Sequence, residues 1–158
     1  MTKNEQAFLE MISWAELGPG LLAVSDRGYN VIVGSTPMFP KLFHDYSDHP
    51  RITVELRDKK GNVVGRSSAA GRYQILKRIY DAYKTRLELP DFSPASQDKI
   101  ALQLIRECKA IEDINAGRIE QAIVKVKSRW ASMPSAGYGQ PEKKMVDLLR
   151  VYDKALRG

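Results

Sequence analysis

A Gly-Pro-Gly break at residues 18 to 20, placed directly after an apolar stretch, most constrains how this chain folds. The apolar residues before it recur at helical spacing, which predicts a helix over residues 5 to 16. Glycine and proline disfavour a helix interior, so we expect that helix to end here. Glu16 then lies on its last turn, beside the negative end of the helix dipole, where a carboxylate is disfavoured.

The position of Glu16 has a chemical consequence as well as a structural one. The dipole and burial beside Trp14 would both favour the protonated carboxyl and raise its pKa. A carboxylic acid that is neutral near pH 7 can act as a general acid. On this residue alone a misplaced surface glutamate is the competing interpretation, and the rest of the chain decides between the two.

Length and composition indicate one folded domain over residues 1–158. Hydrophobic residues make up 43% of the chain and charged residues 28%, as in globular proteins that bury a core. The single cysteine, Cys108, cannot form an internal disulfide and has no clustered partners for a metal, so we expect a packed thiol. The sequence carries no cofactor fingerprint, so neither a metal nor a cofactor is expected.

The N-terminal residues are polar and lack the apolar core of a signal peptide, and no segment approaches about 20 apolar residues. We therefore expect synthesis in the cytoplasm without stable membrane insertion. The net charge is +6, and residues 118–158 hold nine Lys or Arg residues against four acids. Such a face attracts nucleic acid, anionic lipid or an acidic cell-wall polymer, or is simply a solvated helix surface.

The order of predicted elements indicates an α+β fold with a small sheet segregated from a helical body. After the first helix, residues 28–34 have the composition of a strand, and residues 51–56 and 63–65 flank a hairpin turn. Helical periodicity then runs from residue 73 to 87, and Ser93-Pro94 resembles a capped helix start. Shorter helices are expected at 110–116 and 118–130, and an amphipathic helix at 141–156. We expect a ligand cleft between the two parts.

Three loop blocks, at residues 45–50, 68–75 and 136–140, together offer tyrosines, amides and glycines. Tyrosine rings stack on apolar faces, and amides form paired hydrogen bonds. Pyranose rings present an apolar face together with hydroxyl groups. The blocks therefore favour a sugar polymer as the ligand, although each block alone is compatible with a turn, a helix start or a flexible loop.

Several motifs resemble the lambda-type phage endolysin family, in the same order along the chain. They are Trp14-Ala15-Glu16, Gly28 to Gly34, Asp45-Tyr46-Ser47-Asp48-His49-Pro50, Gly71-Arg72-Tyr73-Gln74, Phe92-Ser93-Pro94, Trp130-Ala131-Ser132 and Ala136-Gly137-Tyr138-Gly139-Gln140. The resemblance spans residues 5 to 141. It implies a lysozyme-like fold and a lytic transglycosylase that cuts peptidoglycan, with the family's catalytic glutamate at Glu16.

The chain departs from the family pattern in several places. The segment after Glu16 is shorter and apolar, with Leu-Gly-Pro-Gly-Leu-Leu at residues 17–22, and the stretch 35–43 is longer. Asn30 stands where the family has an aspartate. Residues 57–67 and the helix after Gln140 match poorly.

The resemblance implies that Glu16 protonates the leaving oxygen and then takes the proton of the muramic acid C6 hydroxyl as that hydroxyl attacks C1. The product is 1,6-anhydro-N-acetylmuramic acid. Intramolecular attack needs no second carboxylate. The alternative is a hydrolytic lysozyme with Asp26, or less directly Asp45 or Asp48, as the second carboxylate. The predicted substrate-binding residues are Tyr46, Asp48, His49, Tyr73, Gln74, Tyr138 and Gln140, with His49 open to a purely structural role.

Two other classes of protein remain as rivals. One is an inactive lysozyme-like module that binds glycan strands without cutting them. The other is a nucleic-acid-binding protein. The position of the aromatic residues argues against it, because they occur among acids and amides rather than among Lys and Arg. The expected partner is the glycan strand of peptidoglycan, without nucleic acid, and the expected state is a monomer. The resemblance implies action on the periplasmic wall after release through a holin-made membrane lesion.

Overall fold

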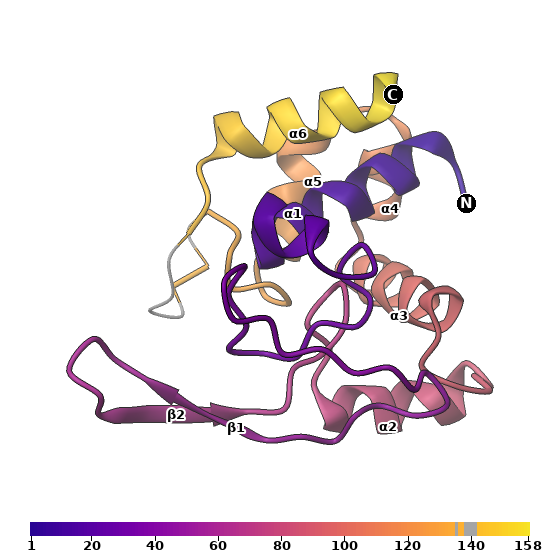
Figure 1. The fold of residues 1–158 in the computed structure, drawn as a ribbon. Coiled ribbons are helices and arrows are strands. Elements are labelled where there is room, and N and C mark those ends of the chain that lie inside the picture. Colours follow the sequence, from indigo (N-terminus) through magenta and orange to yellow (C-terminus); the bar gives the residue numbers. More distant parts are fainter. Residues whose placement is uncertain (135, 138–141) are drawn as a thin grey trace. The chain divides into compact units, whose positions relative to one another are not determined.

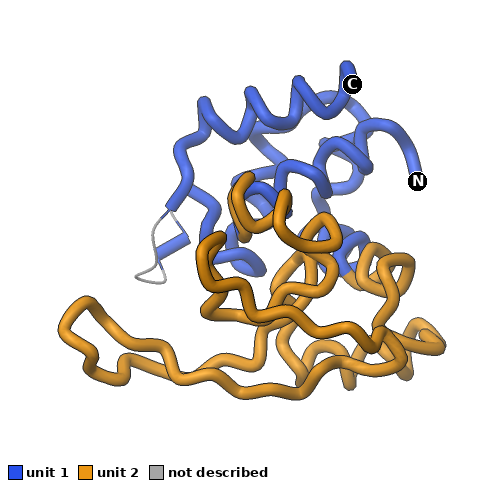
Figure 2. The backbone as a smooth tube through the Cα atoms, viewed as in Figure 1, with its two compact units in different colours: residues 1–16, 101–158 blue, residues 17–100 orange. Residues whose placement is uncertain are grey.

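The computed structural model describes residues 1–134, 136–137 and 142–158. Two compact units divide the chain (Figure 2): residues 1–16 with 101–158 form the first, and residues 17–100 form the second. The boundary therefore falls directly after Glu16. The assignment of residues 1–158 to one domain stays a prediction, because compact units of this kind also occur within single domains.

The described residues form six helices and one two-stranded antiparallel sheet (Figure 1), which confirms the α+β prediction. The helices are α1 (Lys3–Ala23), α2 (Lys77–Arg86), α3 (Pro94–Glu107), α4 (Ile111–Asn115), α5 (Ile119–Val126) and α6 (Met145–Arg157). The strands are β1 (Val54–Arg57) and β2 (Val63–Ser67).

Helix α1 is interrupted at the predicted position but resumes. Gly18 has φ 77° and ψ 163°, a conformation that is essentially restricted to glycine. The expectation that the first helical segment ends just after Glu16 is correct. The expectation that the chain then leaves the helix is wrong. Pro19 opens a second short helical segment, and proline is well accommodated at a first helical position, where its missing N–H costs nothing.

The predicted hairpin is present as β1 and β2, which pair from Val54 opposite Ser67 to Arg57 opposite Val63, with an irregularity before Arg57. Gly61 has φ 83°, which the turn requires. The Asp58 carboxylate accepts hydrogen bonds from two backbone amides of the turn, at 2.9 Å each. Local turn chemistry thus explains the hairpin.

The predicted strand over residues 28–34 is not formed. This segment makes only isolated bridges, Val31 with Leu42 and Ile32 with Ala70, and both of its terminal glycines have positive φ. The β-branched residues are buried here by tertiary packing, with Val31 1% exposed. The β-branched composition of this segment therefore indicated that its residues are buried, and not that they form a hydrogen-bonded strand.

Helix α2 begins four residues later than its periodicity predicts. Gly71 and Gln74 have φ values of 83° and 52°, which a helix does not allow. On either side of this segment, the backbones of Ala70 and Ile75 exchange two hydrogen bonds, at 3.1 and 2.8 Å. Residues 71–74 are therefore a closed four-residue loop, which we call the 71–74 loop.

The later helices follow the sequence signals more closely. Helix α3 starts at Pro94 as predicted, and the Ser93 hydroxyl accepts from the Ser96 amide at 3.4 Å. Helices α4 and α5 also form, although α5 ends at Val126 rather than near residue 130. Helix α6 starts at Met145, and the predicted start at Pro141 lies outside the described residues.

Each unit has its own core. In the first unit the large side chains that are less than 2% exposed are Phe8, Met11, Ile12, Ile105, Ile114, Ile123, Met133 and Leu148. In the second unit they are Tyr73, Tyr80, Phe92 and Ile100. The N-terminal part of α1 contributes three members of the first core, so the helix that carries Glu16 is fixed by packing along its buried face.

Candidate active site

Glu16 lies two residues before the Gly18 break, on a helical segment whose opposite face is buried. The residue as a whole is half-buried. Desolvation by the surrounding protein raises the pKa of Glu16 from 4.5 to about 7. A carboxyl with this pKa is about half protonated at neutral pH, which is the state a general acid needs.

Two residues near the C-terminal end of the first unit oppose that shift. The Ser132 hydroxyl and the positive charge of Lys143 both favour the carboxylate and lower the pKa of Glu16, by less than burial raises it. Ser132 is 7% exposed, and its Oγ has no strictly aligned hydrogen-bond partner among the described residues. The hydroxyl thus acts on Glu16 through a looser contact than an ideal hydrogen bond.

Ser132 and Lys143 are held together by the backbone, because the Lys143 amide donates to the Ser132 carbonyl at 2.8 Å. The Lys143 ammonium also lies 5.9 Å from the centroid of the Trp14 ring, on the same helix as Glu16. Sequence reasoning missed both residues as members of the site. Ser132 belongs to a motif shared with the endolysin family, whereas nothing in the sequence singles out Lys143.

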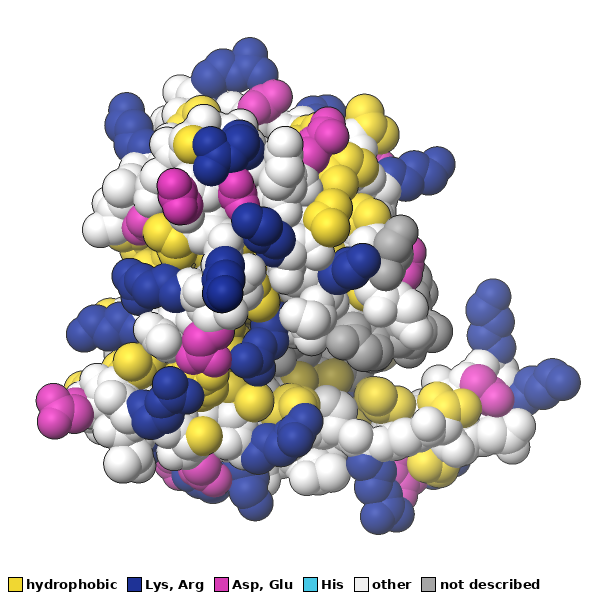
Figure 3. All heavy atoms as spheres, turned by 180° about the vertical axis from the view of Figure 1, so that it is seen from behind, with side chains coloured by type: hydrophobic (Ala, Val, Ile, Leu, Met, Phe, Trp, Pro, Cys, Tyr) yellow, Lys and Arg dark blue, Asp and Glu magenta, His cyan; other side chains and the backbone are white. Residues whose placement is uncertain are grey.

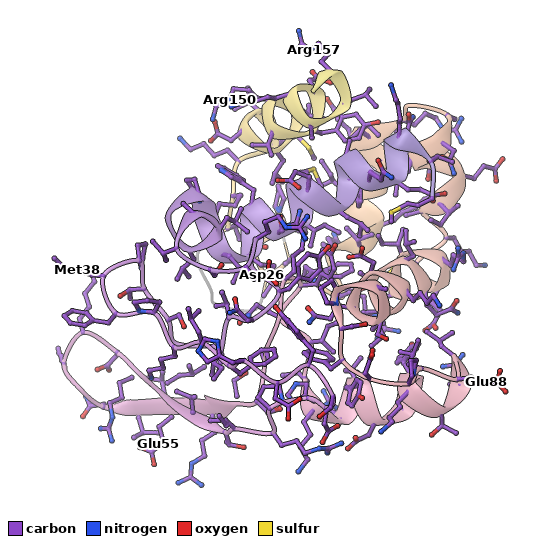
Figure 4. All side chains as sticks on the ribbon, turned by 45° about the vertical axis from the view of Figure 1, so that its right-hand side comes forward. Asp26, Met38, Glu55, Glu88, Arg150 and Arg157 are labelled. Carbon is purple, nitrogen blue, oxygen red and sulfur yellow. The ribbon has the colours of Figure 1, made fainter. Side chains whose placement is uncertain are left out.

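Asp26, the candidate second carboxylate, lies in the second unit (Figure 4). It is exposed, and Oδ2 accepts a hydrogen bond from the Tyr46 hydroxyl at 2.7 Å. Burial and the neighbouring Asp26 carboxylate raise the pKa of Tyr46 above its usual range. Asn30, where the family has an aspartate, accepts from the Asp26 backbone amide through Oδ1 at 2.9 Å. Tyr46 and Asn30 therefore both help to fix the loop that carries Asp26.

Asp48 and His49 make hydrogen bonds within the second unit. Arg51 donates to the Asp48 carboxylate at 2.7 and 3.2 Å and to Asp81 at 2.6 and 3.2 Å. The His49 ring is 2% exposed, and burial lowers its pKa. Its Nδ1 accepts from the Arg51 amide at 3.0 Å, so Nε2 carries the proton that faces the Ile75 carbonyl at 2.9 Å.

Tyr73 and Gln74 are on the 71–74 loop. Tyr73 is 1% exposed, and its hydroxyl donates to Asp98 at 2.6 Å. The Gln74 side chain donates from Nε2 to the Gly71 carbonyl at 2.9 Å. Gln74 has a positive φ, and such backbone conformations are concentrated at functional positions.

The structure therefore brings Glu16, Ser132 and Lys143 together in the first unit. It places Tyr46, Asp48, His49, Tyr73 and Gln74 in the second unit, each with an internal hydrogen-bond partner. Tyr138 and Gln140 lie outside the described residues. Among residues 1–134, 136–137 and 142–158, no group of three or more His, Cys, Asp or Glu side chains could hold a metal ion.

Known proteins share this arrangement of elements. A family model described as Endolysin matches residues 6–157. The chain is 44% identical to the endolysin of Escherichia phage P2, over 97% of this chain and 93% of that protein. It is 45% identical to the endolysin of Escherichia phage lambda, over 98% and 92%.

Solved structures give the same result. The lysozyme of bacteriophage lambda complexed with a chitohexasaccharide superimposes with a TM-score of 0.88 at 45% identity, covering 98% of this chain and 95% of that one. A second structure of lambda lysozyme gives a TM-score of 0.83 at 44% identity over the same shares. The predicted lysozyme-like fold is confirmed. The chain belongs to the endolysin family.

Proposed function

We propose that this chain is an enzyme that cleaves the β-1,4 bond between N-acetylmuramic acid and N-acetylglucosamine in peptidoglycan. The observation that carries the proposal is the Glu16 carboxyl with a pKa of about 7 at the end of a packed helix. Its relatives are endolysins, and the related lambda lysozyme binds a sugar hexamer. A half-protonated carboxyl is suited to protonating the oxygen that leaves when a glycosidic bond breaks.

The reaction we favour is lytic transglycosylation. Glu16 gives its proton to the leaving glycosidic oxygen as the C1–O bond breaks. The resulting carboxylate then takes the proton from the C6 hydroxyl of the same muramic acid, whose oxygen forms the new bond to C1. The cycle returns Glu16 to its protonated form, consumes no water and leaves a 1,6-anhydro ring.

Ser132 and Lys143 support this cycle because Glu16 must be an acid in one step and a base in the next. Burial alone favours the neutral acid, whereas the hydroxyl and the ammonium favour the carboxylate. The balance leaves the pKa close to neutrality, where both forms are populated. Intramolecular attack replaces the second carboxylate with proximity.

Hydrolysis by a lysozyme mechanism is the second candidate. Asp26 favours it because this carboxylate is exposed and oriented by the Tyr46 hydroxyl. In that reaction Asp26 would activate water or stabilise the positive charge at C1. The predicted sugar contacts of either reaction are Tyr46, Asp48, Gln74, Tyr138 and Gln140. His49 and Tyr73 were predicted as contacts too, but they are 2% and 1% exposed and bond internally, so we assign them a structural role that fixes their loops.

Digestion of purified peptidoglycan, followed by mass spectrometry of the products, distinguishes the candidates. Transglycosylation gives muropeptides lighter by one water than hydrolysis gives. Asp26→Asn should then keep most of the activity, whereas loss of activity together with reducing-end muramic acid would assign hydrolysis. A protein that binds peptidoglycan without releasing any product would be the inactive glycan-binding module.

The Glu16→Gln substitution tests the role of the acid itself. It should abolish product release, because an amide cannot donate the proton, while the fold is retained. Glu120→Gln is a matched control, since this glutamate is exposed on a helix of the same unit. Undiminished cleavage by Glu16→Gln would overturn the proposal.

We propose a cell-wall polymer rather than nucleic acid as the partner, since the relatives of this chain are endolysins. On the face in Figure 3, Lys and Arg side chains are spread among Asp and Glu side chains and form no continuous patch. Four of the basic residues after position 117 pair with acids, namely Arg118, Lys125, Arg129 and Arg150. We propose a monomer that is made in the cytoplasm and reaches the periplasmic wall through a holin lesion.

No helix of the described residues is long and apolar enough to cross a membrane. Expression of the chain in host cells tests the proposed route to the wall. Lysis should follow only when a holin or another permeabilising agent is supplied. Lysis by the chain alone would contradict holin dependence without affecting the proposed chemistry.

A further inference from the structure

The loop at residues 35–41 ends in a fully exposed apolar tip. Pro37, Met38, Phe39 and Pro40 are all exposed, and we call these four residues the apolar apex. Met38 is 83% and Phe39 75% exposed, more than any other large apolar side chain of the described residues. The Met38 side chain points away from the ribbon of its own unit (Figure 4). An adjacent pair of this kind has no role in the core of the protein.

The apolar apex is held in one shape by hydrogen bonds within its loop. The backbones of Thr36 and Phe39 bond to each other at 3.1 and 3.3 Å, and the Thr36 hydroxyl accepts from the Phe39 amide at 3.1 Å. The Ser35 hydroxyl donates to the Ile32 carbonyl at 2.6 Å and accepts from the Lys41 amide at 2.8 Å. Binding through such a loop loses little conformational entropy.

Neighbouring segments of the same unit support the apex. A β-carbon on Gly20 would lie 2.6 Å from Pro37, so the loop packs closely on the second segment of α1. That segment, residues 17–24, contains no polar side chain, and Pro19, Ala23 and Val24 are exposed in it. Residues 17–24 and the 35–41 loop therefore meet in space at Gly20 and Pro37.

Lys41 is the charged residue of the 35–41 loop, and it is exposed. Residues 27–44 contain no Asp or Glu. Arg27, at the start of this stretch, lies 3.9 Å from the Asp26 carboxylate. The four side chains of the apex carry no hydrogen-bonding group, and the neighbouring Ser35 hydroxyl donates inside the loop, so the apex offers few hydrogen bonds to a sugar. An apolar tip with the exposed Lys41 at its base matches an anionic lipid bilayer, in which apolar chains lie beneath negative headgroups.

We propose that the apolar apex is a docking site for an anionic lipid bilayer. Met38 and Phe39 enter the interfacial region, and Lys41 stays at the level of the headgroups. The attachment is peripheral and reversible, since two side chains bury far less apolar surface than a spanning helix does. It would hold the enzyme at a membrane surface, and it does not depend on the chemistry at Glu16.

Vesicle co-sedimentation with the whole chain tests the proposal, using vesicles of phosphatidylglycerol with phosphatidylethanolamine and others of phosphatidylcholine alone. We expect binding to the anionic vesicles that weakens with salt. The double substitution Met38→Ser with Phe39→Ser should weaken that binding by at least about tenfold, because the inserted apolar surface is lost. Lys41→Gln should give a smaller loss, confined to anionic vesicles.

Val146→Ser is the matched control, because this valine is 69% exposed but belongs to α6 in the other unit. It should bind vesicles like the unsubstituted chain. Thermal midpoints should be unchanged in all variants, and digestion of lipid-free peptidoglycan should be unaffected. This last measurement separates the proposal from the enzymatic function, which Glu16→Gln tests.

Three outcomes would overturn the proposal. The first is the absence of vesicle binding by the unsubstituted chain. The second is equal binding by the double variant. The third is a double variant that loses affinity for purified peptidoglycan while it keeps its affinity for vesicles, which would assign the apex to the glycan instead.

Discussion

The amide group of Gln97 occupies the space that a side chain at position 71 would need: a β-carbon on Gly71 would lie 2.2 Å from Gln97 Oε1. The same Oε1 accepts from the Arg72 amide at 3.0 Å. Nε2 donates to the carbonyls of Tyr29 and Phe92 at 3.0 and 2.9 Å. One buried side chain therefore ties the 71–74 loop to two other segments of the second unit.

Gln97→Leu should lower the free energy of unfolding by about 3 kcal/mol or more, because it leaves three buried backbone groups without partners. Gly71→Ala should cost about 2–4 kcal/mol, since it combines a clash with a positive φ. Urea denaturation followed by circular dichroism measures both. Gln103→Leu on the same helix is the control, because Gln103 is partly exposed and its side chain donates to the Glu107 carboxylate rather than to a buried backbone group. Equal losses in Gln97→Leu and Gln103→Leu would contradict this account of Gln97.

The pKa of Glu16 predicts how activity depends on pH. The first step needs the protonated carboxyl, so the rate should fall as the pH rises through about 7. A pH–rate profile on purified peptidoglycan measures this limb. A rate that is constant between about pH 6 and 9 would show that Glu16 is not the acid.

The raised pKa of Glu16 also makes the stability of the folded protein depend on pH. The folded protein holds the Glu16 proton more tightly than the unfolded chain does. The contribution of this proton to the free energy of unfolding is therefore complete below pH 4.5 and is lost as the pH rises through about 7. Glu16→Gln should therefore be more stable than the unsubstituted chain at about pH 8, by up to about 3 kcal/mol, and close to it at about pH 4. Thermal melts at the two pH values measure the difference. A destabilised variant at both values would contradict the burial of Glu16.

Lys143 should set the position of the pH profile. Lys143→Gln removes a charge that favours the Glu16 carboxylate, so the pKa of Glu16 should rise and the alkaline limb should move upward by up to about one pH unit. The neighbouring Lys144→Gln is the control, because Lys144 is exposed. A downward shift, or equal shifts in both variants, would be inconsistent with the position of Lys143 near Glu16.

The break in α1 should depend on glycine through backbone conformation alone. Apart from adjacent backbone, no atom of the described residues lies within 4 Å of a β-carbon built on Gly18, yet its φ of 77° and ψ of 163° strain any other residue. Gly18→Ala should therefore lower the free energy of unfolding by about 1–3 kcal/mol. Gly65→Ala is the control, because Gly65 has equal space without a positive φ. Denaturant titration compares them, and equal stability of Gly18→Ala and the unsubstituted chain would contradict the strain.

Local sequence signals predicted those elements that depend on local chemistry. The hairpin follows from its glycine turn, and α3 follows from Ser93-Pro94, because turn dihedrals and helix caps involve neighbouring residues. The predictions of a strand over residues 28–34 and of a start of α2 near residue 73 were wrong. In both cases the spacing of apolar residues correctly indicated burial. Isolated bridges to distant segments determine the backbone of the first segment, and positive φ at Gly71 and Gln74 determines that of the second.

The sequence by itself determined that Glu16 stands at the end of a packed helical segment, because apolar periodicity and a Gly-Pro-Gly break are local properties. The tertiary structure alone decided the environment of its carboxyl, since Ser132 and Lys143 are distant in sequence and desolvation depends on everything that packs nearby. It also decided that the segment after Glu16 and the loop at residues 35–41 meet at Gly20 and Pro37. The surroundings of Glu16 and the approach of Gly20 to Pro37 both depend on contacts between residues far apart in the chain, and the periodicity of apolar residues carries no information about such contacts.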